Sequence, residues 1–115
     1  MTEAPMNELA KQIHEWCERK GWNKDLVLGN MVANLHTEIS EAWECIRNGH
    51  DPQDVWEEWD PVHKGKPEGF GIELADLIIR VLHICAHYDI DIDKLLAWKM
   101  MYNETRPYRH GNKTA

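Results

Sequence analysis

GIELADLIIRVLHICAHY, residues 71–88, is mostly apolar and has neither Gly nor Pro after its first residue, so it predicts one helix of ordinary length. At about 100° per residue, its polar side chains share about 80° of arc: Glu73, Asp76, Arg80, His83 and His87. The other faces are apolar, as is typical of a buried helix. Buried carboxylates are costly unless they are paired or bound to metal, so we expect the polar stripe to face an interior site, a partner or a water-filled cleft.

The bulk composition indicates one domain, residues 1–115, with enough hydrophobic residues, 43%, to form a core. The net charge of −7 argues against a generic nucleic-acid binder, and an acidic protein that handles phosphates needs metal ions to offset repulsion. No leader-like or membrane-spanning apolar segment is visible, so we expect a cytoplasmic protein without membrane contact. Cys17, Cys45 and Cys85 are odd in number and lack CxxC spacing, which favours free thiols.

Three further helices are expected on either side of this stretch, over residues 6–20, 30–47 and 92–105. Asp91 or Asp89 can cap the last of them, and Pro107 begins a tail over residues 107–115. The fold class predicted is therefore all-α, a four-helix bundle with a long connection between the second and third helices.

The long connection, residues 48–70, is rich in Pro and Gly. Asp51-Pro52 is expected to begin a short helix over residues 53–59, on which Trp56 and Trp59 would share a face. Loops of this length in small domains are lids, binding loops or disordered segments, and aromatic side chains in a lid could stack on a base.

Two pairs of carboxylates have i, i+3 spacing, Glu38 with Glu41 and Glu73 with Asp76. If their helices are neighbours, four carboxylates converge, and an all-oxygen cluster is suited to Mg²⁺ or Mn²⁺. Asn34 lies beside the first pair and is a further candidate to contact substrate. On the last helix a basic face would lie opposite and contact phosphate oxygens through three side chains: Lys99, Asn103 and Arg106.

Each of these features also has a structural interpretation. An ExxE pair is most often a solvated helix edge, and Arg80 could simply pair with Asp76 one turn away. His83 and His87 are interpreted as satisfied interior or interface histidines rather than ligands. Lys99 and Arg106 could be surface cations near a helix C-terminus, and most of the tryptophans are expected in the core.

The ordered set of motifs resembles the MazG-like family of all-α nucleoside triphosphate pyrophosphohydrolases. The resemblance covers residues 30–113 and is carried by three stretches: HTEISEAWE, KPEGFGIELADLIIRVL and KMMYNETRPYRHGNK. Two features depart from the family pattern: Thr37 stands where a second Glu often precedes the first ligand, and the segment between the carboxylate motifs is longer than usual.

The resemblance implies an enzyme that hydrolyses a phosphoric anhydride, releasing a nucleoside monophosphate and pyrophosphate from a (d)NTP or modified nucleotide. Mg²⁺, with Mn²⁺ as a substitute, would be held by the catalytic carboxylates Glu38, Glu41, Glu73 and Asp76. Lys99, Asn103 and Arg106 would contact the nucleotide, mostly its phosphates. The family commonly forms dimers or tetramers, so the expected partners are the nucleotide and further copies of the chain.

Three alternatives remain open from the sequence. A phosphoribosyl-ATP pyrophosphohydrolase would share the chemistry on another substrate, and a non-catalytic helical module could bind nucleotide or protein without turnover. A carboxylate-bridged di-iron oxidase is disfavoured because such sites use Glu-x-x-His, whereas Glu41 and Asp76 stand at the third position after Glu38 and Glu73.

Overall fold

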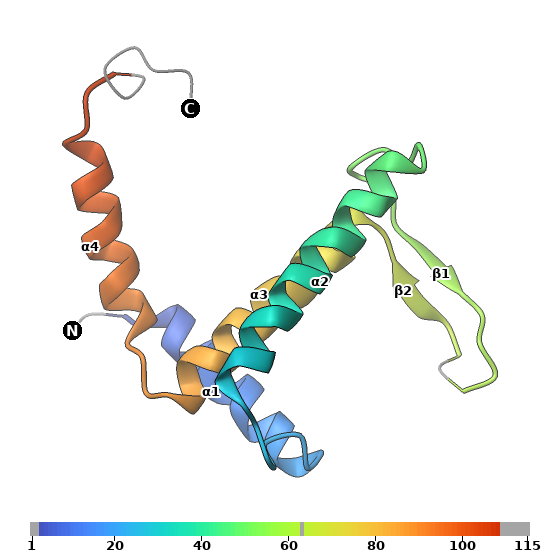
Figure 1. Ribbon diagram of the computed structural model, residues 1–115, viewed down its shortest axis with the longest axis horizontal. Helices are drawn as coiled ribbons and strands as arrows, with labels where there is room; N and C mark the ends of the chain where they lie inside the picture. The colour runs from blue at the N-terminus through green and yellow to red at the C-terminus, as the bar shows by residue number, and fades with distance from the viewer. Residues whose placement is uncertain (1–2, 63, 109–115) are drawn as a thin grey trace.

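Four helices and one small hairpin make up the chain, which a computed structural model describes over residues 3–62 and 64–108. The elements, in order, are α1 (Pro5–Arg19), α2 (Leu28–Arg47), β1 (Trp56–Glu58), β2 (Lys66–Glu68), α3 (Phe70–His87) and α4 (Ile92–Glu104) (Figure 1). The expected helical fold with four helices is confirmed, and each helix begins and ends within two residues of its predicted bounds.

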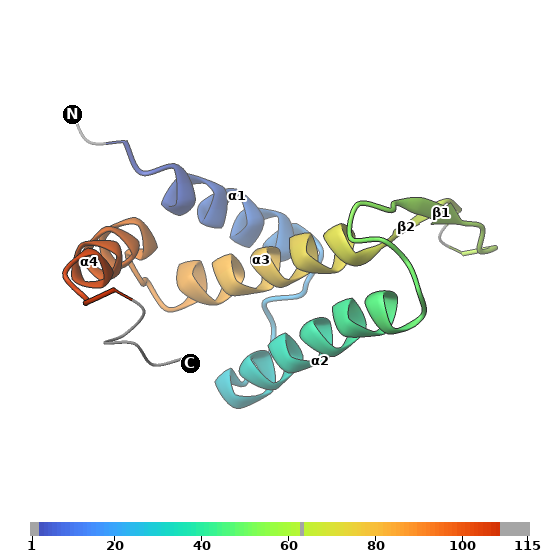
Figure 2. The same ribbon diagram turned by 90° about the horizontal axis from the view of Figure 1, so that it is seen from above.

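Helix α3 lies between α1 and α2 and packs against both (Figure 2). The main core forms where α1 crosses α3, from Ala10, Ile13 and Cys17 of α1 and Leu82 of α3. Packing of an amphipathic face, rather than propensity alone, stabilises helices of this length. All three cysteines are free thiols as predicted, with Cys17 and Cys85 buried.

The apolar faces of α2 and α3 are less buried than the sequence predicts. In α2 the buried side chains are Met31, Glu38 and Ala42, whereas Ile39 and Trp43 are 52% and 58% exposed. Ile78 of α3 is 53% exposed as well. The face of α2 that packs on α3 therefore includes the carboxylate of Glu38, which pairs with Arg80 of α3. Part of the apolar stripe of α2, and part of that of α3, is exposed instead.

Helix α4 is held at its N-terminal end by contacts with the start of α1. The Asp91 carboxylate accepts a hydrogen bond from the Lys94 backbone N–H at 3.2 Å, as predicted for a cap. Asp93 accepts from the backbone N–H groups of Met6 and Asn7 at 3.2 and 2.7 Å. The rest of α4 extends away from α2 (Figure 1), so these four helices do not close into a bundle within the described part of one chain.

The predicted helix over residues 53–59 is wrong, because β1 and β2 form an antiparallel hairpin in that region. Trp56 lies opposite Glu68, and Glu58 lies opposite Lys66. Lys64 and Gly65 have positive φ angles of 40° and 81°, which reverse the chain before β2. Pairing of β1 with a strand about ten residues further along the chain outweighed the local preference for a helix. Trp59 lies beyond the end of β1, so it does not share a helix face with Trp56.

The predicted tail begins at Pro107, and its residues 109–115 lie outside the described part of the chain. Among the described residues, no helix combines the length and the apolar character needed to cross a bilayer.

Candidate metal centre

Carboxylates from α2 and α3 meet where the two helices lie side by side. Glu38 of α2 and Glu73 and Asp76 of α3 each place an oxygen within 4.8 Å of the others. The i, i+3 spacing of Glu73 and Asp76 puts both on one helix face, and helix packing adds Glu38 to them. Three of the four predicted carboxylates are therefore close enough to share one cation.

Glu38 is the most buried charged residue of this group, with only 4% of its surface exposed. Its Oε1 lies 3.0 Å from Arg80 Nε, and Asp76 Oδ1 lies 3.7 Å from the same nitrogen. The contact with Glu38 lacks hydrogen-bond alignment, so it is an ion pair only. Glu38 Oε2 is buried without a hydrogen-bond partner among the described residues, and such an atom is costly unless something binds it.

The crowding of carboxylates shifts their protonation. Burial, followed by the adjacent carboxylate of Glu41 and then that of Glu38, raises the pKa of Glu73 to about 7. Burial and then Asp76 raise the pKa of Glu38, while the positive charge of Arg80 opposes that rise. One cation, Arg80, does not neutralise the cluster, so the site favours an additional positive charge.

Glu41 lies at the edge of the cluster, on the side of the hairpin. It contributes to the raised pKa of Glu73 and lines an open hollow of about 350 Å³ together with Glu73, Trp56 and Lys66. Lys66 Nζ lies 3.0 Å from Glu68 Oε1 and brings a positive charge to this hollow. Trp56 stacks on His50 with ring centroids 4.2 Å apart, whereas Trp59 is 77% exposed and does not line the hollow.

A second cavity, also of about 350 Å³, opens on the side of α1. Its lining includes the charged side chains of Asp76 and Arg80. Trp16 and Trp22 line it too, with ring centroids 4.9 Å apart in a T-shaped arrangement. Asn34 lines it too, which places this predicted substrate contact next to the carboxylates. A small cavity lined by both aromatic and charged side chains is suited to a ligand that has apolar and charged groups.

The basic residues of α4 are not brought to the carboxylates within one chain. Lys99, Asn103 and Arg106 are exposed, the first two on α4 and the third just beyond its end, and α4 packs against α1. The Lys99 ammonium lies 4.9 Å from the ring centroid of Tyr102 on the same helix. Their predicted role therefore depends on contacts that are absent between the described residues of a single copy.

The sequence pattern does not single out Trp16, Trp22 or Lys66 as site residues. Trp16 occupies an apolar position of α1 that predicts a core side chain, and Lys66 lies in a segment without helical periodicity. Their positions depend on how α1 and the hairpin pack beside α3, and a one-dimensional pattern does not encode that packing.

Comparisons with protein families, with characterised proteins and with solved structures find no match to this chain.

Proposed function

We propose that the chain is a Mg²⁺-dependent nucleotide pyrophosphohydrolase of the MazG-like type, which cleaves a (d)NTP or modified nucleotide to its monophosphate and pyrophosphate. The observation that carries the proposal is the convergence of Glu38, Glu73 and Asp76 around a buried oxygen, Glu38 Oε2, that lacks a partner among the described residues. A hard divalent cation satisfies such an all-oxygen donor set, so the residues fit Mg²⁺ or Mn²⁺.

In this proposal Glu38, Glu73 and Asp76 hold the metal, with Glu41 beside them. When bound, the metal would polarise a phosphoryl oxygen and lower the pKa of a water. Glu38 is buried and paired with Arg80, whereas Glu41 is exposed on the side of the hairpin. We therefore assign to Glu41 the acceptance of the proton from the attacking water.

The two cavities beside the carboxylates support a nucleotide as the substrate. Trp16 and Trp22 offer aromatic surface on which a base can stack. Lys66 offers a cation for phosphate oxygens on the other side of the cluster. A nucleotide would then span the carboxylates, with its base toward α1 and its phosphates toward the hairpin.

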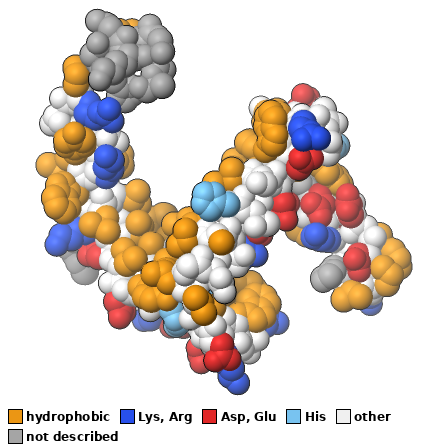
Figure 3. Space-filling model, viewed as in Figure 1, with side chains coloured by type: hydrophobic (Ala, Val, Ile, Leu, Met, Phe, Trp, Pro, Cys, Tyr) orange, Lys and Arg blue, Asp and Glu red, His pale blue; other side chains and the backbone are white. Residues whose placement is uncertain are grey.

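The positions of Lys99, Asn103 and Arg106 support a homodimer or homotetramer. Hydrophobic side chains cover much of α4 (Figure 3), where Trp98 and Met101 are 67% and 70% exposed. A monomer rarely leaves a contiguous apolar surface of this kind in water. A second copy that covers it would bring α4 of one chain toward the carboxylates of the other.

Purified protein incubated with canonical and modified NTPs and dNTPs, with Mg²⁺ or with EDTA, tests the proposal by chromatography of the products. We expect monophosphate and pyrophosphate with Mg²⁺ and no turnover with EDTA. In the Glu73→Ala and Asp76→Ala variants kcat/KM should fall by about a thousandfold or more, since loss of the metal removes several kcal/mol of transition-state stabilisation.

Glu8→Ala is the matched control, because Glu8 is an exposed carboxylate of α1 that lines neither of the two cavities. It should retain the activity, and circular dichroism should show unchanged helix content in all three variants. Diphosphate and phosphate as products, or full activity of Glu73→Ala, would contradict the proposal. If the protein hydrolyses phosphoribosyl-ATP and none of the other nucleotides, the proposed substrate class is wrong and the proposed metal site still stands.

A further inference from the structure

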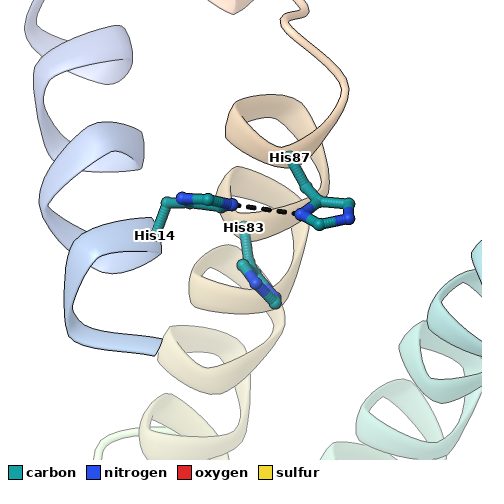
Figure 4. Close-up of side chains that lie close together, drawn as sticks. All are labelled: His14, His83 and His87. Atoms are coloured by element: carbon teal, nitrogen blue, oxygen red, sulfur yellow. Dashed lines mark hydrogen bonds between the residues drawn. The ribbon is translucent and has the colours of Figure 1, made fainter. Parts of the chain in front are cut away.

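Three histidines form a second cluster, apart from the carboxylates. His14 comes from α1, and His83 and His87 come from α3 (Figure 4). Each offers a ring nitrogen within 4.8 Å of the others, and all three side chains are partly exposed. None of them belongs to the carboxylate cluster: His83 lines the cavity on the side of α1, but it is two helical turns from Asp76, about 10 Å along α3.

The geometry of the rings brings their nitrogens together. His14 Nε2 and His87 Nδ1 lie 3.0 Å apart, so one donates a hydrogen bond to the other. His83 and His87 are spaced i, i+4 and therefore project from the same face of α3. Ring centroids are separated by 5.3 Å for His14 and His87, and by 5.7 Å for His14 and His83.

Asn23 determines which nitrogen of His83 is free. The Asn23 side-chain N–H₂ donates to the backbone carbonyl of His14 at 3.1 Å and to Glu18 Oε2 at 2.8 Å. Asn23 Oδ1 is therefore an acceptor, and it lies 2.6 Å from His83 Nε2, which must donate. His83 Nδ1 keeps its lone pair, and a hydrogen bond of this kind on the opposite nitrogen is typical of metal-binding histidines.

The surroundings of His83 also favour its neutral form. Burial, followed by the nearby rings of His14 and His87, lowers the pKa of His83. A neutral His83 ring presents a lone pair to a bound ion.

We propose that His14, His83 and His87 form a binding site for a divalent transition-metal ion of the zinc class. Imidazole nitrogens prefer Zn²⁺, Ni²⁺ or Cu²⁺, whereas Mg²⁺ prefers oxygen. In a tetrahedral site with Zn–N distances of about 2.0–2.1 Å, the ligand nitrogens lie about 3.3 Å apart. The nitrogens here already lie within 4.8 Å of one another, so side-chain rotations that shorten these distances by up to about 1.5 Å would complete the site.

The bound ion would connect α1 to α3 next to the main core. His14 is one residue from Ile13, and His83 follows Leu82, both members of that core. An ion that binds the folded chain and not the unfolded one raises its stability. The proposed role is therefore a metal link between α1 and α3.

Titration of the full untagged chain with Zn²⁺, in the presence of excess Mg²⁺, tests the site. Nuclear magnetic resonance of the histidine rings should show changes at His14, His83 and His87 and none at the exposed His36 of α2. The Tm of the wild-type chain should rise with Zn²⁺ and not with further Mg²⁺.

Affinity measured by calorimetry in variants identifies the ligands. His14→Ala and His83→Ala should each weaken Zn²⁺ binding by about 100-fold or more, and Asn23→Ala by about 10- to 100-fold, as expected for a residue that orients a ligand. His36→Ala should leave the affinity unchanged. Circular dichroism without metal confirms that the variants fold.

The proposal is overturned if the histidine ring resonances of the wild-type chain do not change with Zn²⁺. This measurement needs no variant, so it remains decisive even if a variant fails to fold. Zn²⁺ binding that is lost in Glu73→Ala and retained in His14→Ala would also overturn it, because the ion would then occupy the carboxylates. Nucleotide turnover is measured separately, so failure of one site is distinguishable from failure of the other.

Discussion

Glu73 and Glu38 show how the carboxylate cluster affects single residues. The pKa of each is raised because burial and neighbouring negative charge disfavour the ionised form. A bound cation reverses that preference, since it stabilises the ionised carboxylates. Proton binding and metal binding therefore compete at the same oxygens.

The first prediction concerns the pH dependence of Mg²⁺ binding. Glu73 must lose its proton to bind the metal, and its pKa is about 7. We expect Mg²⁺ affinity to increase by up to about tenfold per pH unit below 7 and to level off above it. Calorimetric titrations between about pH 5.5 and 8.5 measure this, and a pH-independent affinity would contradict it.

The second prediction concerns the stability of the metal-free chain. The pKa of Glu73 rises from 4.5 to about 7 on folding, so the folded state binds more protons between these values. The contribution of Glu73 to stability is fully present below about pH 4.5 and is lost as the pH rises through 7. Glu73→Gln should therefore raise the Tm at pH 8 by a few degrees, about 2 to 4 °C.

Differential scanning calorimetry in EDTA across this pH range provides the measurement. The exposed carboxylate variant Glu44→Gln is the control and should keep the pH dependence of the wild type. A Glu73→Gln variant less stable than the wild type at pH 8 would show that the ionised form of Glu73 stabilises the fold.

At the scale of elements, the hairpin joins α3 through Gly69. Gly69 has a φ of 138°, and a Cβ added there would lie 2.4 Å from the backbone oxygen of Asp54. The close approach fixes the start of α3, and hence Glu73, against the segment that leads into β1. Gly71, in the first turn of α3, differs from it, because a Cβ added there would meet no atom within 4 Å.

The third prediction compares alanine at these two glycines. Gly69→Ala should destabilise the chain by about 2 kcal/mol or more, because both the backbone conformation and the contact with Asp54 are unfavourable for a Cβ. Gly71→Ala should be neutral or stabilise by up to about 1 kcal/mol through its higher helix propensity. Chemical denaturation measures both, and equal effects would contradict the assigned role of Gly69.

At the scale of the whole molecule, α4 lies at one end of the long axis and the β1–β2 hairpin at the other (Figure 1). The principal extents are 52, 37 and 30 Å, and α4 carries exposed Trp98, Met100 and Met101. Exposed apolar surface on α4, together with Ile39 and Trp43 on α2, is the basis for the proposed oligomer.

The fourth prediction is that the basic residues of one copy complete the carboxylate site of another. A Glu73→Ala chain and a Lys99→Ala/Arg106→Ala chain should each be inactive alone. After mixing and subunit exchange in a dimer, half of the molecules are hybrids with one intact site, so about a quarter of the wild-type activity should return.

The control for this exchange is a mixture of Glu73→Ala with Asp76→Ala, which places both defects in the same half of the site and should stay inactive. Light scattering should confirm the same oligomeric state for all variants. Recovery in neither mixture would mean that Lys99 and Arg106 do not act across copies.

Local periodicity in the sequence was enough to locate all four helices and the i, i+3 carboxylate pairs, because each depends on residues within a few positions of one another. It left Asp91 and Asp89 as alternative caps of α4, and the structure selects Asp91. The tertiary structure alone decided that α2 turns Glu38 toward α3, that residues 56–58 pair as a strand, and that His14 joins His83 and His87. It also separated Lys99 from the carboxylates within one chain. These features depend on the free energy of contacts between segments that are distant in the sequence, and that free energy cannot be read from a pattern of neighbouring residues.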